Sequence, residues 1–101
     1  METFCNIIKK AREKKKLLIR QAAAMLDIDP SLLSKYENGD RRPTRELIEK
    51  MSIIYELDKN EILTEWLSDK IVYVISSEEN AIEILKVAEE KINFNNSVEG
   101  I

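Results

Sequence analysis

The sequence of 101 residues contains no histidine and only one cysteine, Cys5. A single cysteine cannot form a disulfide within the chain, and without histidine a zinc site would have to rest on carboxylates alone. The chain also lacks a glycine-rich phosphate loop and a paired acidic metal motif. We therefore expect a protein that is not an enzyme and uses no metal or cofactor, with Cys5 as a small apolar packing residue.

Glycine and proline are scarce, with two of each. Runs of Glu, Lys, Leu, Ile and Ala between them favour helices joined by short turns, so the sequence predicts an all-α fold with one modest core. No stretch approaches the roughly 20 apolar residues that cross a bilayer. The N-terminus lacks the basic and apolar segments of a secretory signal, so we expect a cytoplasmic protein that does not bind membranes.

Charge is distributed unevenly along the chain. Residues 1–50 contain 12 Lys or Arg and 8 Asp or Glu, a net charge of +4, whereas residues 51–101 contain 4 and 11, a net charge of −7. A basic half joined to an acidic half suggests that one face meets a polyanion and the other faces protein or solvent.

Apolar residues recur at helical spacing in six segments. We expect helices over about 3–15, 19–26, 30–38 and 45–55, a fifth that begins after Asp58 or Asn60 and reaches Val74, and a sixth that extends to Ile92. The β-branched run at 71–75 has strand propensity, which leaves a strand as the alternative there. The polar segment 93–101 is expected to be a frayed tail.

Turn and cap residues separate these segments. Asp29 is a good N-cap and Pro30 suits the first position of a helix, which Gly39 then ends by adopting a left-handed conformation. Thr44 can cap the next helix. The string from Ser76 to Glu79 matches a capping box for the last one.

The residue strings of the first half closely resemble the Cro/C1 (XRE) family of helix-turn-helix DNA-binding regulators. The matching segments are Arg12 to Leu17, Ala22 to Asp29, Leu33 to Gly39 and Arg42 to Thr44, within about residues 4–63. The resemblance implies a five-helix, lambda-repressor-like domain followed by a C-terminal helical extension. It also implies close helix approach at Ala23 and a shared core at Leu26, Ile28 and Leu33.

The family commonly pairs an arginine of the first helix with a glutamate near the end of the recognition helix, which implies a structural pair of Arg12 and Glu37. The chain departs from the family pattern where Leu18 and Ile19 replace the usual polar start of the second helix. Asp27 stands where glycine is usual in the turn, which is tolerable because Asp visits the left-handed region more readily than most residues.

The resemblance places double-stranded DNA on the third helix and its surroundings. Pro30 can offer no hydrogen bond, so base reading falls to Ser31, Ser34 and Lys35, and Lys35 can reach the guanine acceptors O6 and N7. Side chains next to these are expected to meet phosphates, which position the protein without reading sequence. They are Arg20, Gln21, Asn38, Arg41 and Arg42.

The second half has more apolar surface than one helix-turn-helix domain needs, and a second subunit is the simplest place to bury it. We expect a homodimer formed through Trp66, Leu67, Ile71, Val74 and Leu85. The expected organisation is a DNA-binding domain at 1–63, a dimerisation extension at 64–92 and a flexible tail at 93–101. This half weakly resembles extensions of regulators encoded beside DNA methyltransferase and restriction-modification genes.

Three functions are compatible with these features. The first is a transcriptional regulator that binds an inverted-repeat operator as a dimer and either blocks or recruits polymerase, and of these two roles we expect repression. The second is a DNA-binding antitoxin whose acidic half neutralises a partner toxin. The third is a protein-interaction module that kept the fold but lost DNA binding.

Overall fold

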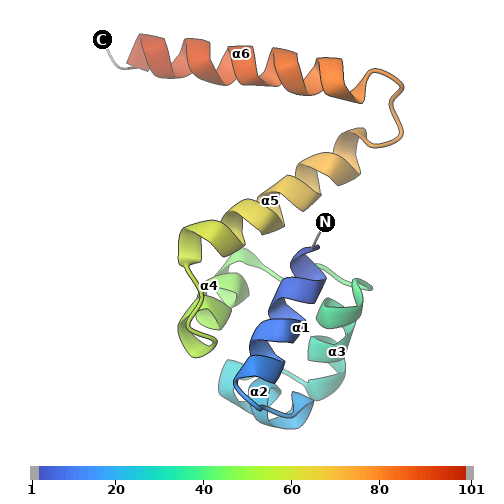
Figure 1. Cartoon of the computed structure of the whole chain (residues 1–101), viewed down its shortest axis with the longest axis vertical. Helices are drawn as coiled ribbons and strands as arrows, with labels where there is room; N and C mark the ends of the chain where they lie inside the picture. The colour runs from blue at the N-terminus through green and yellow to red at the C-terminus, as the bar shows by residue number, and fades with distance from the viewer. Residues whose placement is uncertain (1–2, 100–101) are drawn as a thin grey trace. The chain divides into compact units, whose positions relative to one another are not determined.

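The computed structural model describes residues 3–99, and these form six α-helices and no strand (Figure 1). The all-α prediction is therefore confirmed. The chain divides into two compact units, one ending at Asp69 and the other beginning at Lys70. The helices are α1 (Phe4–Lys14), α2 (Ile19–Leu26), α3 (Pro30–Asn38), α4 (Arg45–Ile54), α5 (Lys59–Ile75) and α6 (Ala81–Glu99).

Short polar side chains start three of the first four helices, because each satisfies a backbone N–H that has no partner within the helix. The Thr3 hydroxyl accepts from the N–H of Asn6, Asp29 accepts from Ser31, and Thr44 accepts from Leu47. The expected caps at Asp29 and Thr44 are thus confirmed. Helix α2 starts differently and is described with the site below.

Four helix ends of the first unit turn through the left-handed region. Gly39 has φ 81° and Asp27 has φ 58°, as the sequence predicts. Lys16 and Glu56 also have positive φ, at 57° and 55°, although neither residue type signals such a turn. In each case the next residue bonds back into the helix, with Leu17 N–H donating to Arg12 O and Leu57 N–H to Ser52 O. These backbone bonds satisfy carbonyls at the helix ends without glycine.

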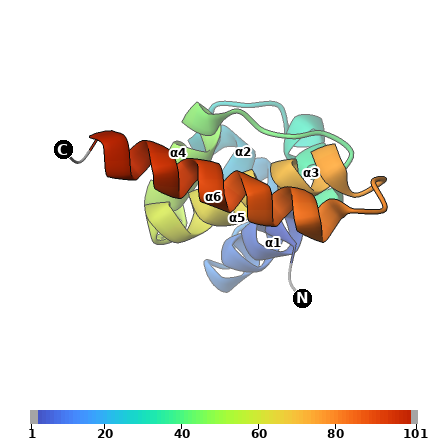
Figure 2. The same ribbon diagram turned by 90° about the horizontal axis from the view of Figure 1, so that it is seen from above.

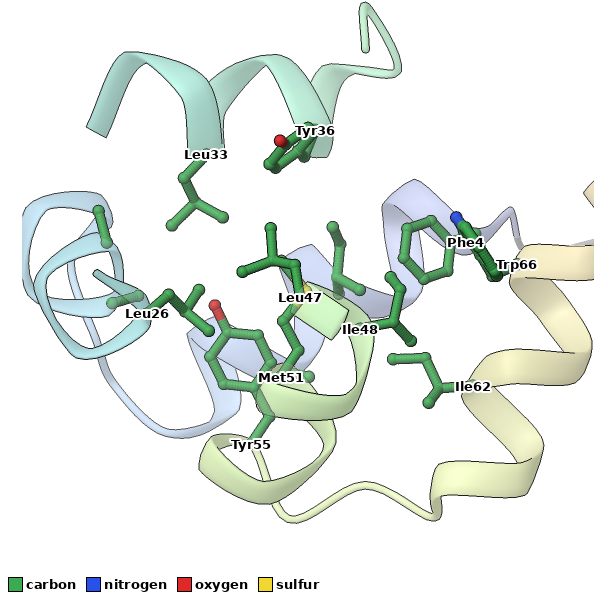
Figure 3. Packing of buried hydrophobic residues seen from close by; sticks show 14 of the residues in the cluster. Phe4, Leu26, Leu33, Tyr36, Leu47, Ile48, Met51, Tyr55, Ile62 and Trp66 are labelled. Atoms are coloured by element: carbon green, nitrogen blue, oxygen red, sulfur yellow. The ribbon is translucent and has the colours of Figure 1, made fainter. Parts of the chain in front are cut away.

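The core of the first unit draws on all five of its helices (Figure 3). Its most deeply buried large side chains are Ile8, Leu26, Leu33, Ile48 and Met51. Helix α3 packs against both α1 and α2, and α4 packs against α2. Burial of apolar surface at roughly 25 cal/mol per Å² is the main force that holds these short helices together.

Helix α5 contributes further to this core than the sequence predicts. Ile62, Leu63 and Trp66 are all buried in the cluster, and Trp66 is only 7% exposed. The predicted dimer residue Trp66 is therefore a core residue, and that prediction is corrected. A side chain already covered by its own chain leaves little apolar surface for a second subunit.

The second unit contains the end of α5, a turn and α6. Helix α6 is drawn as one uninterrupted helix in both views (Figures 1 and 2). The β-branched run at 71–75 is helical, so the strand alternative is wrong. The capping box at Ser76 and Glu79 is wrong as well, because α6 begins at Ala81 and Ile84 N–H donates to Asn80 O. Residues 93–99 continue α6 in place of the expected tail, since no proline or glycine interrupts them; the last two residues lie outside the described part.

Candidate nucleic-acid interface

The turn between α2 and α3 spans residues 27–29 and fixes the angle between the two helices. Asp27 closes α2 in the left-handed conformation, and Ile28 N–H donates to Ala23 O at 3.0 Å. Ala22 and Ala23 are fully buried, so the small side chains let α2 approach its neighbours closely. Local backbone geometry and small residues together produce a helix-turn-helix.

Helix α3 has one buried and one exposed face. Leu33, Tyr36 and Glu37 are buried, which holds the helix to the core. Four predicted DNA-binding residues, Ser31, Ser34, Lys35 and Asn38, belong to this helix, and spacings of three and four residues bring them to its other side. Of these, Ser31, Lys35 and Asn38 are exposed and Ser34 is partly buried.

Ser31 is already engaged at the start of α3. Its hydroxyl donates to Asp29 Oδ1 at 2.7 Å, and its backbone N–H donates to the same oxygen at 2.8 Å. The bond from the Ser31 side chain, followed by the bond from its backbone, lowers the pKa of Asp29. The cap therefore keeps a negative charge beside Ser31, and the Ser31 oxygen is left mainly as an acceptor.

The start of α2 shows how the chain manages without the usual polar cap. Leu18 occupies the cap position, and the Leu18 N–H donates to Gln21 Oε1 at 2.8 Å. The Gln21 side chain thus folds back on its own helix, and its amide nitrogen remains able to donate to another group. Arg20 beside it is exposed.

The structure brings Arg12 and Glu37 together in the interior. Arg12 Nε donates to Glu37 Oε2 at 2.8 Å and Nη2 donates to Oε1 at 3.1 Å, while Nη1 donates to Leu17 O at 2.7 Å. The hydrogen bond to Glu37 raises the pKa of Arg12. The pair ties α1 to the end of α3, and with 9% and 7% exposure neither residue is placed to meet DNA.

Tyr55 is a buried neighbour of this pair that the sequence did not single out. Among residues 3–99 its hydroxyl finds no hydrogen-bond partner. Burial, and next the negative charge of Glu37, raise the pKa of Tyr55 to about 12. The hydroxyl therefore stays neutral under physiological conditions.

Arg41 and Arg42 in the loop after α3 have different surroundings. Both side chains are exposed, and among residues 3–99 Arg41 makes no side-chain hydrogen bond or ion pair. Arg42 Nη2 donates to Trp66 O at 2.8 Å, and the guanidinium carbon lies 5.7 Å from the centre of the Trp66 ring. The sequence predicts a phosphate contact for both residues, but only the tertiary structure reveals the contact between Arg42 and α5.

The described residues were also compared with the requirements of a metal site and of a membrane-spanning helix. Residues 3–99 hold no cluster of three or more His, Cys, Asp or Glu side chains that could bind a metal ion. None of the helices in the same range is both long enough and apolar enough to span a membrane.

The sequence model of the helix-turn-helix family matches residues 8–62, more than half of the chain. The protein therefore belongs to this family, the Cro/C1-type or XRE helix-turn-helix proteins, and carries the DNA-binding domain of a transcription regulator. The match ends four residues before Trp66 and covers little of α5 and none of α6. Comparison with curated proteins and with solved structures found no match.

Proposed function

We propose that the protein is a sequence-specific transcriptional repressor, not an enzyme, that inserts α3 into the major groove of operator DNA. The observation that carries this proposal is the single face of α3 on which Ser31, Ser34, Lys35 and Asn38 gather. A capped helix with a buried rear face and a polar front is the element that such domains present to base edges.

Lys35 is the main base reader in this proposal, because its exposed ammonium group can bind the O6 and N7 acceptors of guanine. Ser34 contributes a hydroxyl, and Ser31 contributes an acceptor oxygen, since its own proton is held by Asp29. Arg20, the amide nitrogen of Gln21, Asn38 and Arg41 contact phosphates on either side. These contacts position α3 without distinguishing one base pair from another.

Titration with a duplex from upstream of the protein's own gene, at several salt concentrations, tests the proposal. Binding should weaken steeply as salt rises, because each phosphate contact releases condensed counterions and adds about 0.9 to the slope of log K against log salt. A random duplex of the same length is the matched competitor. Equal affinity for both duplexes at all salt concentrations would contradict sequence-specific recognition.

The same proposal includes a homodimer formed through exposed apolar side chains of α5 and α6. Leu67, Ile71, Val74 and Leu85 are each more than a third exposed in the single chain. Exposed large apolar side chains that share a helical region are typical of an interface between subunits. A two-fold dimer would present two copies of α3, so half-sites would lie roughly 34 Å or about 10 base pairs apart, or at a multiple of that spacing.

Sedimentation of Ile71→Glu and Leu85→Glu variants tests the dimer. Each change places a charge on the proposed interface and should shift the protein toward monomer. Ile53→Glu is the matched control, because Ile53 is 77% exposed on α4 in the first unit. A wild-type protein that sediments as a monomer at tens of micromolar, or variants that dimerise as well as wild type, would contradict this part of the proposal.

The acidic second half favours a second candidate, a DNA-binding antitoxin. The net charge of −7 over residues 51–101 would complement a basic partner protein. A basic protein that co-purifies at fixed stoichiometry and loses its toxicity in the complex would support this candidate over an autonomous repressor. Purification of a homodimer alone would favour the first proposal.

A further inference from the structure

Arg42 makes two contacts with the same residue of α5. Its Nη2 donates to the backbone oxygen of Trp66 at 2.8 Å, and its guanidinium lies 5.7 Å from the centre of the Trp66 ring. Because the Trp66 side chain is buried in the core, the ring is a fixed platform. A planar guanidinium can donate a hydrogen bond and stack on an aromatic face at the same time, which a lysine cannot do equally well.

The backbone on both sides of Arg42 is also restrained. Pro43 is buried, and a residue that precedes proline is held in an extended conformation. Thr44 then caps α4 by accepting the Leu47 N–H at 3.3 Å. On the other side, Gly39 ends α3 and Asp40 N–H donates to Lys35 O at 2.9 Å. Arg42 therefore stands between two fixed points, the end of α3 and the start of α4.

Asp69, one turn after Trp66 on α5, contacts the first turn of α1. Asp69 Oδ2 accepts the Phe4 N–H at 3.3 Å, and a Cβ added at Gly39 would lie 3.4 Å from Cys5 Sγ. Phe4 and Trp66 lie on the same side of the buried cluster in Figure 3. The start of α1, Gly39 just after α3 and the Trp66 turn of α5 thus lie around the loop that carries Arg42.

We propose that Arg42 is a positioning residue for DNA binding: it ties the loop after α3 to Trp66 of α5 and thereby aims Asn38 and Arg41 at the phosphates. This role rests on the proposed function and replaces the direct phosphate contact that the sequence predicts for Arg42. The bond to Trp66 O engages Nη2, and the Trp66 ring covers one face of the guanidinium, so a direct contact would have to use Nε or Nη1. Arg41, one residue earlier, is exposed like Arg42, but among residues 3–99 no contact of this kind holds its guanidinium.

A double-mutant cycle on DNA affinity separates the two roles. Arg42→Ala should weaken binding by roughly three- to tenfold on operator and random duplexes alike, the range expected from one lost contact. In an Asn38→Ala/Arg41→Ala background the same change should have little further effect, because the residues through which it acts are gone. Undiminished loss in that background would overturn the positioning role and establish a direct contact.

Arg42→Lys provides a second, independent test. Lysine keeps a cation that can bind a phosphate but does not reproduce the combined stacking and hydrogen bond. Positioning predicts that Arg42→Lys binds DNA nearly as weakly as Arg42→Ala, and near-wild-type affinity would overturn it. All binding is measured well below the melting temperature of each variant, with circular dichroism to establish that the variant is folded.

Trp66 is the sole tryptophan, so its fluorescence reports on the contact directly. Arg42→Ala should change the emission of the free protein, whereas duplex DNA added to wild type should leave the emission unchanged, because Arg42 stays on the ring. A wild-type emission that moves to that of Arg42→Ala on binding would overturn the inference.

If wild type binds no duplex at all, the proposed function fails. If wild type binds but the cycle is additive, only the role of Arg42 fails.

Discussion

Arg12 donates to both carboxylate oxygens of Glu37, at 2.8 and 3.1 Å, and with its remaining terminal nitrogen reaches Leu17 O. A bidentate pair of this kind satisfies both charges in a site that excludes most water. Glu37 belongs to the last turn of α3, and Arg12 belongs to α1. The pair therefore sets where the recognition helix ends relative to the rest of the domain.

Replacement of Arg12 by alanine should destabilise the fold by about 3 kcal/mol, because it leaves the buried Glu37 carboxylate without its partner. Chemical denaturation monitored by circular dichroism measures this loss. Lys14→Ala is the matched control, since Lys14 is exposed on the same helix and should change the free energy of unfolding by less than about 0.5 kcal/mol. An Arg12→Ala variant with unchanged stability and lost DNA binding would instead make Arg12 a phosphate contact.

Tyr55 should make the protein lose stability at alkaline pH. Its folded pKa of about 12 lies above the ordinary value near 10, so the native state holds the proton more tightly than the unfolded chain does. The contribution is fully present below about pH 10 and is lost as the pH rises toward 12, at up to about 1.4 kcal/mol per pH unit.

Tyr55→Phe should remove this part of the pH dependence. At neutral pH it should be nearly neutral or slightly stabilising, because the hydroxyl has no hydrogen-bond partner among residues 3–99. Tyr73→Phe is the control, since Tyr73 is 82% exposed. Denaturant melts of the three proteins from pH 7 to 12 measure the effect, and parallel curves for wild type and Tyr55→Phe would refute it.

Gly39→Ala should destabilise the protein by about 1 kcal/mol, because Gly39 has φ 81° and a side chain is strained there. The added Cβ would lie in ordinary contact with Cys5 Sγ at 3.4 Å, so the strain comes from the backbone. Gly39→Asn should cost less, since asparagine tolerates this conformation. Adding Cys5→Ala to Gly39→Ala should not restore the melting temperature; full recovery would show that crowding at the sulfur is the cause.

Lys35→Ala should reduce the preference for operator over random DNA by about tenfold or more, the range of one good base contact. Lys86→Ala, which removes the same charge from an exposed position on α6, should leave this ratio unchanged. Competition gel shifts at fixed salt measure the ratio. If Lys35→Ala weakens operator binding and random binding by the same factor, the ratio does not change, and Lys35 contacts phosphate and does not read bases.

Local sequence determined most of the helical framework. The N-caps at Asp29 and Thr44 and the left-handed ends at Asp27 and Gly39 all lie where the sequence predicts them, because each depends on a residue and its near neighbours. The motif strings of the first half also predicted the family, which the comparison over residues 8–62 confirmed. The run at 71–75 was ambiguous, since β-branched residues fit either a strand or a helix and neighbours decide.

Only the tertiary structure decided how distant residues use these elements. Trp66 was predicted at a dimer interface from an apolar stripe, but it is buried within the core of the first unit and accepts a hydrogen bond from Arg42 at its backbone oxygen. Lys16 and Glu56 turn left-handed although their residue types give no such signal, because closure of the helix ends imposes the conformation. An apolar stripe on a helix predicts that a side chain will be buried, but it does not predict which residue the side chain will contact. For Trp66 that residue is Arg42, which lies 24 positions earlier in the sequence. The free energy of that contact depends on packing that no local pattern records.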